Sequence, residues 1–322
     1  MLLDIKNLNL KFHTSKGILH AIRDLSFHIK QGETLGIVGE SGCGKSITNL
    51  ALMGLLPDTA ELTADKLEFQ GQELIGLKER EWQKIRGSDI AMIFQDPMTA
   101  LNPCFTVGYQ IEETLEMHRR DLSKLERKEF VFELLDQVGI PAPKERAKSY
   151  AHELSGGMSQ RVMIAQAIAC NPKLLIADEP TTALDVTIQD QILKLLKDIQ
   201  AKNNMAMILV THDLGVVSEN ADRIQVMYAG EVIETGTSDE VIHSPKHPYT
   251  KGLLESLPGS NATTFRAPLS SIAGMVPDLR SRPQGCQFNP RCFKVKDDCS
   301  ISRPVLNEEN HQVSCFYPMS EG

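Results

Sequence analysis

A glycine-rich stretch, GESGCGKS at 39–46, constrains the fold of this chain more than any other feature. It follows an apolar run at 35–39, typical of a buried parallel strand, and precedes a helix-like run at 47–56. In that context the spacing Gly39-x4-Gly44-Lys45-Ser46 predicts a phosphate-binding loop between a strand and a helix. The alternative is a glycine-rich turn that matches by chance, and the flanking strand and helix argue against it.

The chemistry expected of this loop follows from its residue types. Gly42 and Gly44 allow backbone N–H groups to face phosphate oxygens, and the following helix directs the positive end of its dipole at the same anion. Lys45 would neutralise the terminal phosphates of a nucleotide, and the Ser46 hydroxyl would ligate Mg²⁺. The predicted nucleotide contacts in the loop are Gly39, Ser41, Gly42, Cys43, Gly44, Lys45, Ser46 and Ile47.

A second phosphate-related motif is the apolar strand LLIADE at 174–179, which ends in two carboxylates. This is the form of a Walker B segment, in which Asp178 would hold Mg²⁺ through its coordination shell. Glu179, one residue further on, could accept a proton from the water that attacks the terminal phosphate, or orient that water. Alone, the segment would be read as a strand end with solvated acids, but the phosphate-binding loop makes the catalytic interpretation stronger.

Strand-like and helix-like segments alternate along most of the chain. Apolar runs at 90–95, 173–179 and 205–213 predict strands, and charged sequence with apolar residues at helical spacing predicts a helical insertion at about 110–138. The segment 226–236 predicts a hairpin that turns at Ala229 and Gly230. Strands separated by helices indicate an α/β fold with a covered parallel sheet.

Composition excludes several classes of protein. In the 322 residues no apolar run approaches the roughly 18 to 20 residues that cross a bilayer. The N-terminal segment lacks the pattern of a secretory signal, so a cytoplasmic chain is expected. A net charge of -8 without a basic block argues against nucleic acid as a partner.

Four of the seven cysteines cluster in a proline-rich tail that begins near residue 250. A reducing cytosol makes structural disulfides an unexpected use for them. Their spacing has no Cys-x2-Cys pair, so the strongest zinc pattern is absent, while four thiolates are also the ligand set of a [4Fe–4S] cluster. Zinc, an iron–sulfur cluster and unliganded thiols remain open on these residues alone. The four are Cys286, Cys292, Cys299 and Cys315.

The segment LSGGMSQR at 154–161, shortly before the Walker B strand, resembles the signature of ATP-binding cassette (ABC) ATPases. The resemblance implies a P-loop NTPase with a RecA-like core, a helical subdomain at about 96–165 and a small loop-rich C-terminal extension. It also implies that ATP and Mg²⁺ are bound between two subunits, with this signature facing the partner's ATP. The expected contacts are Ser155, Gly156, Gly157 and Gln160; a plain helix N-cap at Ser155 is the alternative.

The other motifs of the resemblance occur in the family's order. Gln95 resembles the Q-loop glutamine that reaches Mg²⁺ and the attacking water, and ALD at 183–185 resembles the D-loop with Asp185. His212 resembles the switch histidine on the terminal phosphate, and Phe12 the aromatic residue that stacks on adenine. Alone, His212 would be a strand-end histidine and Phe12 a core residue. Ile47 stands where Thr is common, so no hydroxyl contact is assigned there.

Three further segments resemble the ATPases of oligopeptide and dipeptide importers. They are PMTALNP at 97–103, HPYTKGLLESLP at 247–258 and GCQFNPRC at 285–292. The change in composition near residue 250 predicts domains at 1–250 and 251–322. The resemblance implies an iron–sulfur cluster on the four tail cysteines. Because these cysteines lie outside the ATP-binding motifs in the sequence, a structural role is favoured, and redox sensing is the alternative. The resemblance also implies import of di- or oligopeptides at the cytoplasmic face of the inner membrane. The alternatives are nickel or another small solute, and a non-transport ABC ATPase.

The same resemblance implies a set of partners. They are a second homologous ATPase in a heterodimer, two transmembrane permeases and an extracytoplasmic substrate-binding protein. The sequence does not define the substrate, because an ATPase subunit does not touch the cargo.

Overall fold

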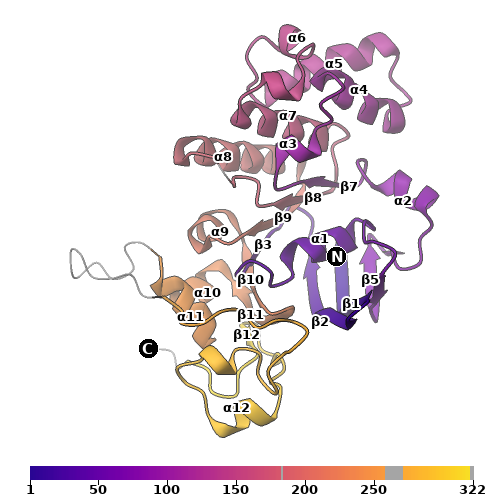
Figure 1. Ribbon diagram of the computed structural model, residues 1–322. Coiled ribbons are helices and arrows are strands. Elements are labelled where there is room, and N and C mark those ends of the chain that lie inside the picture. The colour runs from indigo at the N-terminus through magenta and orange to yellow at the C-terminus, as the bar shows by residue number, and fades with distance from the viewer. Residues whose placement is uncertain (183, 258–270, 320–322) are drawn as a thin grey trace. The chain divides into compact units, whose positions relative to one another are not determined.

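Residues 1–182, 184–257 and 271–319 are described by the computed structural model of the chain (Figure 1). The chain divides into two compact units, which are described separately. Unit 1 contains Met1–Ile29, Thr34–Ile75 and Leu209–Gly322; unit 2 contains Lys30–Glu33 and Gly76–Ile208. Within the described ranges, no helix combines the length and the apolar character needed to cross a membrane.

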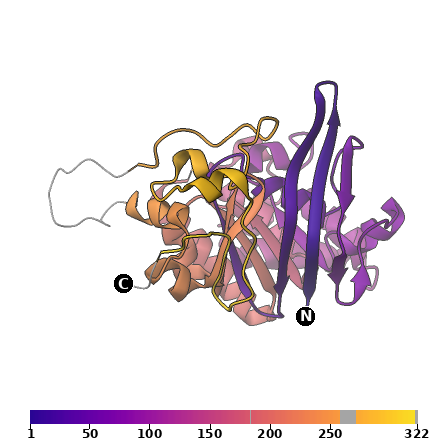
Figure 2. The same ribbon diagram turned by 90° about the horizontal axis from the view of Figure 1, so that it is seen from below.

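Unit 1 begins with an antiparallel sheet that is ordered β2-β1-β5-β6, with β4 also paired to β1. The strands are β1 (Leu3–Thr14), β2 (Gly17–Ile29), β4 (Ala60–Thr63), β5 (Lys66–Phe69) and β6 (Gln72–Glu73). Figure 2 shows β1 and β2 as a long hairpin in indigo. Alternation along β1 buries Leu8 and Leu10 completely, because successive side chains of a strand point to opposite faces of the sheet.

The second sheet of unit 1 carries the phosphate-binding loop. Its strands are β3 (Thr34–Val38), β10 (Arg223–Tyr228), β11 (Glu231–Thr237) and β12 (Gln312–Val313), in the order β12-β11-β10-β3. Strand β3 is parallel to β10, and β10 forms the predicted hairpin with β11. Ala229 and Gly230 turn the hairpin with φ of 47° and 79°, which fits the positive φ that tight hairpin turns require.

The helices of unit 1 are short, and several of them belong to the C-terminal part of the chain. They are α1 (Lys45–Leu52), α9 (Leu214–Asn220), α10 (Ser238–His243), α11 (Pro248–Glu255), the 3₁₀ turn η2 (Asn289–Arg291) and α12 (Asp297–Ile301). The C-terminal extension joins the β-structure directly, because Val313 and Gln312 of β12 pair with Glu234 and Thr235 of β11.

Unit 2 is mainly helical and includes two parallel strands, β7 (Ile90–Ile93) and β8 (Leu174–Asp178). Its helices are α2 (Glu79–Ile85), α3 (Pro97–Ala100), α4 (Val107–His118), α5 (Lys124–Gln137), α6 (Pro143–Arg146), the 3₁₀ turn η1 (Ala151–Glu153), α7 (Gly156–Ile168) and α8 (Val186–Asn203). Strand β9 (Ala206–Thr211) crosses the division between the units.

The helical insertion predicted at about 110–138 is confirmed and consists of two helices. The second helix has its own start, because Ser123 caps α5 by accepting from the N–H of Glu126 while the Glu126 carboxylate accepts from the N–H of Ser123. The strand predicted over 90–95 ends at Ile93, so Gln95 lies in the following turn. The domain boundary near 250 stays a prediction.

Candidate functional site

The phosphate-binding loop of unit 1 connects the buried strand β3 to α1. Gly42 and Gly44 have φ of 79° and 109°, a region that glycine occupies without strain. A Cβ on Gly44 would overlap Cδ1 of Ile22, so any other residue here would also force that side chain to shift. The amide of Gly230 donates to the carbonyl of Cys43 at 2.8 Å, which ties the loop to the β10–β11 turn.

Lys45 lies inside this loop and is 5% exposed. Its Nζ donates to the carbonyl oxygens of Gly39 at 2.6 Å and Glu40 at 3.2 Å. A buried ammonium needs oxygen partners, and the oxygens of a bound phosphate are stronger acceptors than these two carbonyls. Ser46, next to it at the start of α1, is exposed. The loop therefore has the donors that a phosphate group requires.

The remaining loop residues differ in exposure. Ser41 and Gly42 are exposed, Ile47 is half-buried and Cys43 is buried. Burial raises the pKa of the Cys43 thiol, although the neighbouring Lys45 opposes this shift. Cys43 can therefore contribute its backbone to the loop but is not a reactive thiolate.

Unit 1 also contains Phe12 and His212. Phe12 is half-buried on β1, opposite Leu19 of β2 and Ala60 of β4. His212 is exposed and directly follows β9, and Asp213 after it caps α9 by accepting from the N–H of Gly215 at 2.7 Å. Adenine stacking by Phe12 and a switch role for His212 both stay predictions.

Unit 2 brings Gln95 and Glu179 into contact through strand register. Strands β7 and β8 are parallel with Ile93 opposite Ala177, so the segments that follow the two strands leave the same edge of the sheet close together. Gln95 Nε2 donates to Glu179 Oε2 at 2.9 Å. The amide and the carboxylate that the sequence predicts for orienting the attacking water are thus hydrogen-bonded.

The backbone at Glu179 adopts an unusual conformation. Its φ is 47°, in the left-handed region that costs a non-glycine residue about 1–3 kcal/mol and that is enriched at active sites. Thr182 Oγ1 donates to the same oxygen, Glu179 Oε2, at 2.9 Å. Sequence reasoning did not identify Thr182; its position three residues after a predicted catalytic acid was the only indication.

Asp178 ends strand β8 and is 3% exposed. A carboxylate at this depth favours a cationic partner, because burial without charge compensation is costly. This placement fits a residue that acts on Mg²⁺ through its coordination shell. The ligation itself stays a prediction.

The signature segment forms the start of α7. Ser155 is its N-cap, with Oγ accepting from the N–H of Met158 at 3.3 Å, so the N-cap interpretation is confirmed. Ser155 and Gly156 are exposed and Gly157 is half-buried. Gln160 is 2% exposed, and its Nε2 has no hydrogen-bond partner in the described part of the chain. Contact of these residues with a partner's ATP stays a prediction.

The D-loop prediction falls partly on Ala183, which lies outside the described residues. Asp185 is exposed and caps α8, with Oδ1 accepting from the N–H of Ile188 at 3.0 Å. A helix cap is a sufficient structural role for this carboxylate. A role at a subunit boundary is therefore a further prediction.

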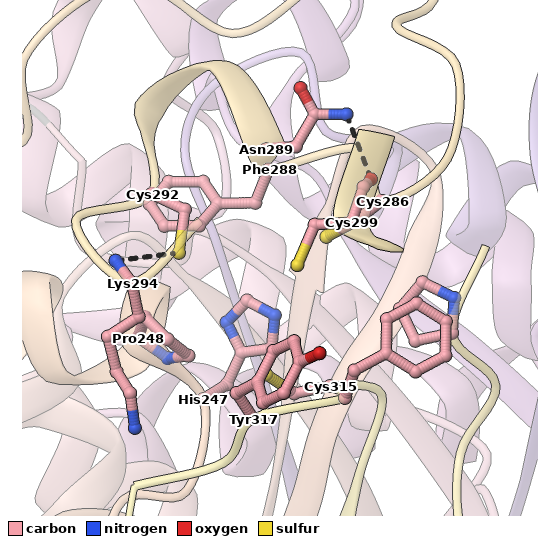
Figure 3. A pocket seen from close by; sticks show the side chains of 12 residues that line it. His247, Pro248, Cys286, Phe288, Asn289, Cys292, Lys294, Cys299, Cys315 and Tyr317 are labelled. Carbon is pink, nitrogen blue, oxygen red and sulfur yellow. Dashed lines mark hydrogen bonds between the residues drawn. The ribbon is translucent and has the colours of Figure 1, made fainter. Parts of the chain in front are cut away.

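The four tail cysteines line one small cavity in unit 1, together with His247 (Figure 3). Burial raises the pKa of Cys286 to about 11, and the other three thiolates add to the effect. Burial also raises the pKa of Cys292 and of Cys315. As free thiols, Cys286, Cys292 and Cys315 are therefore protonated at neutral pH, and a cationic group would be needed to hold them as thiolates.

The predicted iron–sulfur cluster is not confirmed. In the described ranges, no three His, Cys, Asp or Glu side chains form a group that could hold a metal ion. The cavity has a volume of about 10 Å³, room for one water molecule at most. The donor set fits a thiolate-bound group in its chemistry, but the side chains would have to move outwards to admit one.

Comparison with known proteins assigns two parts of the chain to known families. The ABC transporter family matches residues 22–182, and the C-terminal region of oligopeptide/dipeptide transporters matches residues 233–299. The dipeptide transport ATP-binding protein DppD of Escherichia coli (strain K12) is 51% identical, over 99% of this chain and 98% of that protein. The oligopeptide transport ATP-binding protein OppD of Bacillus subtilis (strain 168) is 52% identical, over 98% of this chain and 88% of the OppD chain.

Solved structures agree with this result. A dimeric ATP-binding cassette in a post-hydrolysis state, bound to ADP and Pi, has a TM-score of 0.65 and 30% identity. The match covers 73% of this chain and 98% of that one. The α/β fold of a P-loop NTPase predicted from the sequence is therefore confirmed. The chain belongs to the ABC transporter family of ATPases, in the branch that carries the oligopeptide/dipeptide transporter C-terminal region.

Proposed function

We propose that this chain hydrolyses ATP to power the import of dipeptides or oligopeptides through a membrane transporter. The observation that carries the proposal is the identity of 50–52% along nearly the whole chain to proteins named for dipeptide and oligopeptide transport. The match of residues 233–299 supports it from outside the ATPase core. Nickel or another small solute is the alternative cargo. We place the chain at the cytoplasmic face of the inner membrane, held there by its partners.

The proposed chemistry assigns one role to each motif. Phe12 stacks on adenine, the phosphate-binding loop and Lys45 hold the phosphates, and His212 contacts the terminal phosphate. The residues that would hold Mg²⁺ are Ser46, Gln95 and Asp178. When bound, the ion neutralises charge on the phosphates. Glu179 takes a proton from the attacking water, and its hydrogen bond from Gln95 supports this role. The signature residues that face the partner's ATP are Ser155, Gly156, Gly157 and Gln160. The D-loop residue Asp185 faces the partner's site as well.

The proposed partners are a second homologous ATPase in a heterodimer, two permeases and an extracytoplasmic binding protein. The proposed contact with the permeases is supported by exposed apolar side chains, which lie between β7 and α4 and at the start of α4. Met98, Phe105 and Tyr109 are 51%, 45% and 47% exposed, and the rings of Phe105 and Tyr109 stack at 4.8 Å. Large exposed apolar groups favour contact with another protein. No nucleic acid partner is proposed.

The function is tested with the complete transporter in lipid vesicles. We expect a dipeptide-loaded binding protein to stimulate ATP hydrolysis and drive dipeptide uptake, while the same protein given nickel does not. A Lys45→Ala complex, deficient in phosphate binding, controls for background hydrolysis. Stimulation by nickel alone would replace the peptide assignment with the solute alternative. Recovery of the chain with ribosomes or DNA, and with no permeases, would contradict transport.

We also propose that Cys286, Cys292, Cys299 and Cys315 hold a [4Fe–4S] cluster that staples the C-terminal extension. Their location around one cavity supports this, and zinc is the alternative. Protein purified without oxygen is expected to be brown, with an absorbance band at about 400 nm. Cys292→Ser should remove the band, and Cys104→Ser, at an exposed cysteine elsewhere, should keep it. Colourless protein with stoichiometric zinc would contradict the cluster.

A further inference from the structure

An acidic side chain lies within the loop that binds phosphate. Glu40 follows Gly39 in the loop, and its carbonyl oxygen accepts from Lys45 Nζ at 3.2 Å. A carboxylate this close to a phosphate site opposes the binding of the polyanionic nucleotide, because like charges repel strongly where water is partly excluded. The P-loop spacing leaves this position unspecified, so the pattern itself does not explain how the negative charge is tolerated.

The C-terminal extension supplies the opposite charge. Arg291 Nη1 donates to both carboxylate oxygens of Glu40, at 3.1 Å and 3.0 Å. The Arg291 side chain is 6% exposed and that of Glu40 is 28% exposed, so solvent screens this pair less than a surface ion pair. Glu40 and Arg291 are 251 positions apart in the sequence. Both residues belong to unit 1.

The extension also holds Arg291 rigidly. Its Nε donates to the carbonyl of Ala273 at 2.9 Å, and its Nη2 donates to the carbonyl of Ile272 at 3.3 Å. The guanidinium lies over the rings of Tyr228 and Phe288, 5.8 Å and 6.0 Å from their centroids. A guanidinium fixed by two carbonyl acceptors and by stacking loses little further freedom when it binds a carboxylate, and a lysine could not reproduce these contacts.

A second residue from the same part of the chain reaches Glu40. The Tyr249 hydroxyl accepts from the backbone N–H of Glu40 at 3.0 Å. Tyr249 is completely buried, and its ring packs against Tyr228 and Phe288 at 4.8 Å and 5.3 Å. It belongs to the HPY segment at 247–249, where Nδ1 of His247 accepts from the Tyr249 N–H. Backbone and side chain of Glu40 are therefore both held by residues from 249 onward.

We propose that Arg291 is a positioning residue for ATP binding: it neutralises Glu40 and keeps its carboxylate turned toward the extension rather than the phosphates. The four-cysteine segment that carries Arg291, directly before Cys292, thereby sets the affinity of the phosphate-binding loop. The extension is part of the nucleotide-binding apparatus and not only an appendage to it. This rests on ATP binding by the family and does not depend on which solute is carried.

The test measures MgATP affinity of the full-length chain by calorimetry, without permeases or cargo. Arg291→Met is expected to weaken binding about tenfold, which corresponds to about 1.4 kcal/mol. Adding Glu40→Gln to Arg291→Met should restore affinity to within about threefold of the original, since no uncompensated carboxylate then remains. Glu40→Gln alone should bind MgATP two- to threefold more tightly, and Arg291→Lys should lie between Arg291→Met and the unaltered chain.

Arg303→Met is the matched control for a purely structural effect. Arg303 also belongs to the extension and pairs with Asp24 at 2.8 Å and with Glu231 at 3.1 Å, and neither of these partners is a residue of the phosphate-binding loop at 39–46. This variant should lower the unfolding temperature but leave MgATP affinity unchanged. In the assembled transporter Arg291→Met should raise KM for ATP with kcat within about twofold.

Three results would overturn the proposal. They are equal losses of affinity in Arg291→Met and Arg303→Met, failure of Glu40→Gln to restore binding in the double variant, and weaker binding by Glu40→Gln alone. The last result decides the matter even if Arg291→Met does not fold, because Glu40→Gln leaves the hydrogen bonds of Arg291 to the carbonyls of Ala273 and Ile272 in place. A transporter that carries a solute other than peptide would leave all of these binding results unaffected.

Discussion

Replacing Glu179 by Gln is expected to lower ATP hydrolysis at this chain's site by about 10²–10⁴-fold while ATP still binds. Gln has nearly the same shape as Glu and can keep the hydrogen bonds from Gln95 and Thr182, both 2.9 Å in length. Its amide cannot accept a proton from the attacking water. The substitution therefore separates the chemical step from the packing around it.

The measurement is single-turnover phosphate release from the proposed heterodimer of this chain and a second ATPase. The partner carries the corresponding Glu→Gln substitution, so that turnover comes from this chain's site alone. Thr182→Val is the control, because it removes one hydrogen bond to Glu179 but keeps the carboxylate, and a loss within about tenfold is expected. Hydrolysis by Glu179→Gln within tenfold of the unaltered rate would show that another group acts as the base.

The local geometry of the predicted phosphate-binding loop and of the signature helix could be predicted from the sequence because its determinants are local. Gly42 and Gly44 have the positive φ that the motif requires, and Ser155 begins a helix as an N-cap residue should. The hairpin at Ala229 and Gly230 could likewise be predicted from the sequence, because turn formation depends on adjacent residues. Patterns of this kind do not depend on which segments meet in space.

Interactions between distant segments could not be predicted in the same way. The contact between Gln95 and Glu179 requires knowing that β7 and β8 are neighbours in parallel register, which no local pattern states. The pairing of Arg291 with Glu40 joins a loop-rich extension to a glycine-rich loop, and neither segment has a periodicity that specifies the other. The helical insertion could be predicted at 110–138, but its division into two helices was not specified, although the capping box at Ser123 and Glu126 is present in the sequence.

A single substitution at Gly156 is expected to abolish hydrolysis in the assembled pair while leaving the isolated chain intact. Gly156→Asp places a carboxylate at the exposed first residue of α7, where the resemblance to ABC ATPases predicts contact with the partner's ATP. The added charge opposes the terminal phosphate there. Loss of one preorganised anion contact alone costs about 10²–10³-fold, so hydrolysis at that site should fall by at least about 10²-fold.

The isolated chain provides the control, because the position is sterically open within it. A Cβ at Gly156 would have no heavy atom of the described residues within 4 Å beyond its own helix and chain neighbours, and an acidic residue in the first turn of a helix is favourable. We therefore expect an unfolding temperature within about 2 °C of the unaltered chain, and unchanged MgATP binding. Loss of MgATP binding by the isolated Gly156→Asp chain would place the defect in its own fold. With binding intact and hydrolysis lost only in the pair, the signature must act on nucleotide held by another subunit.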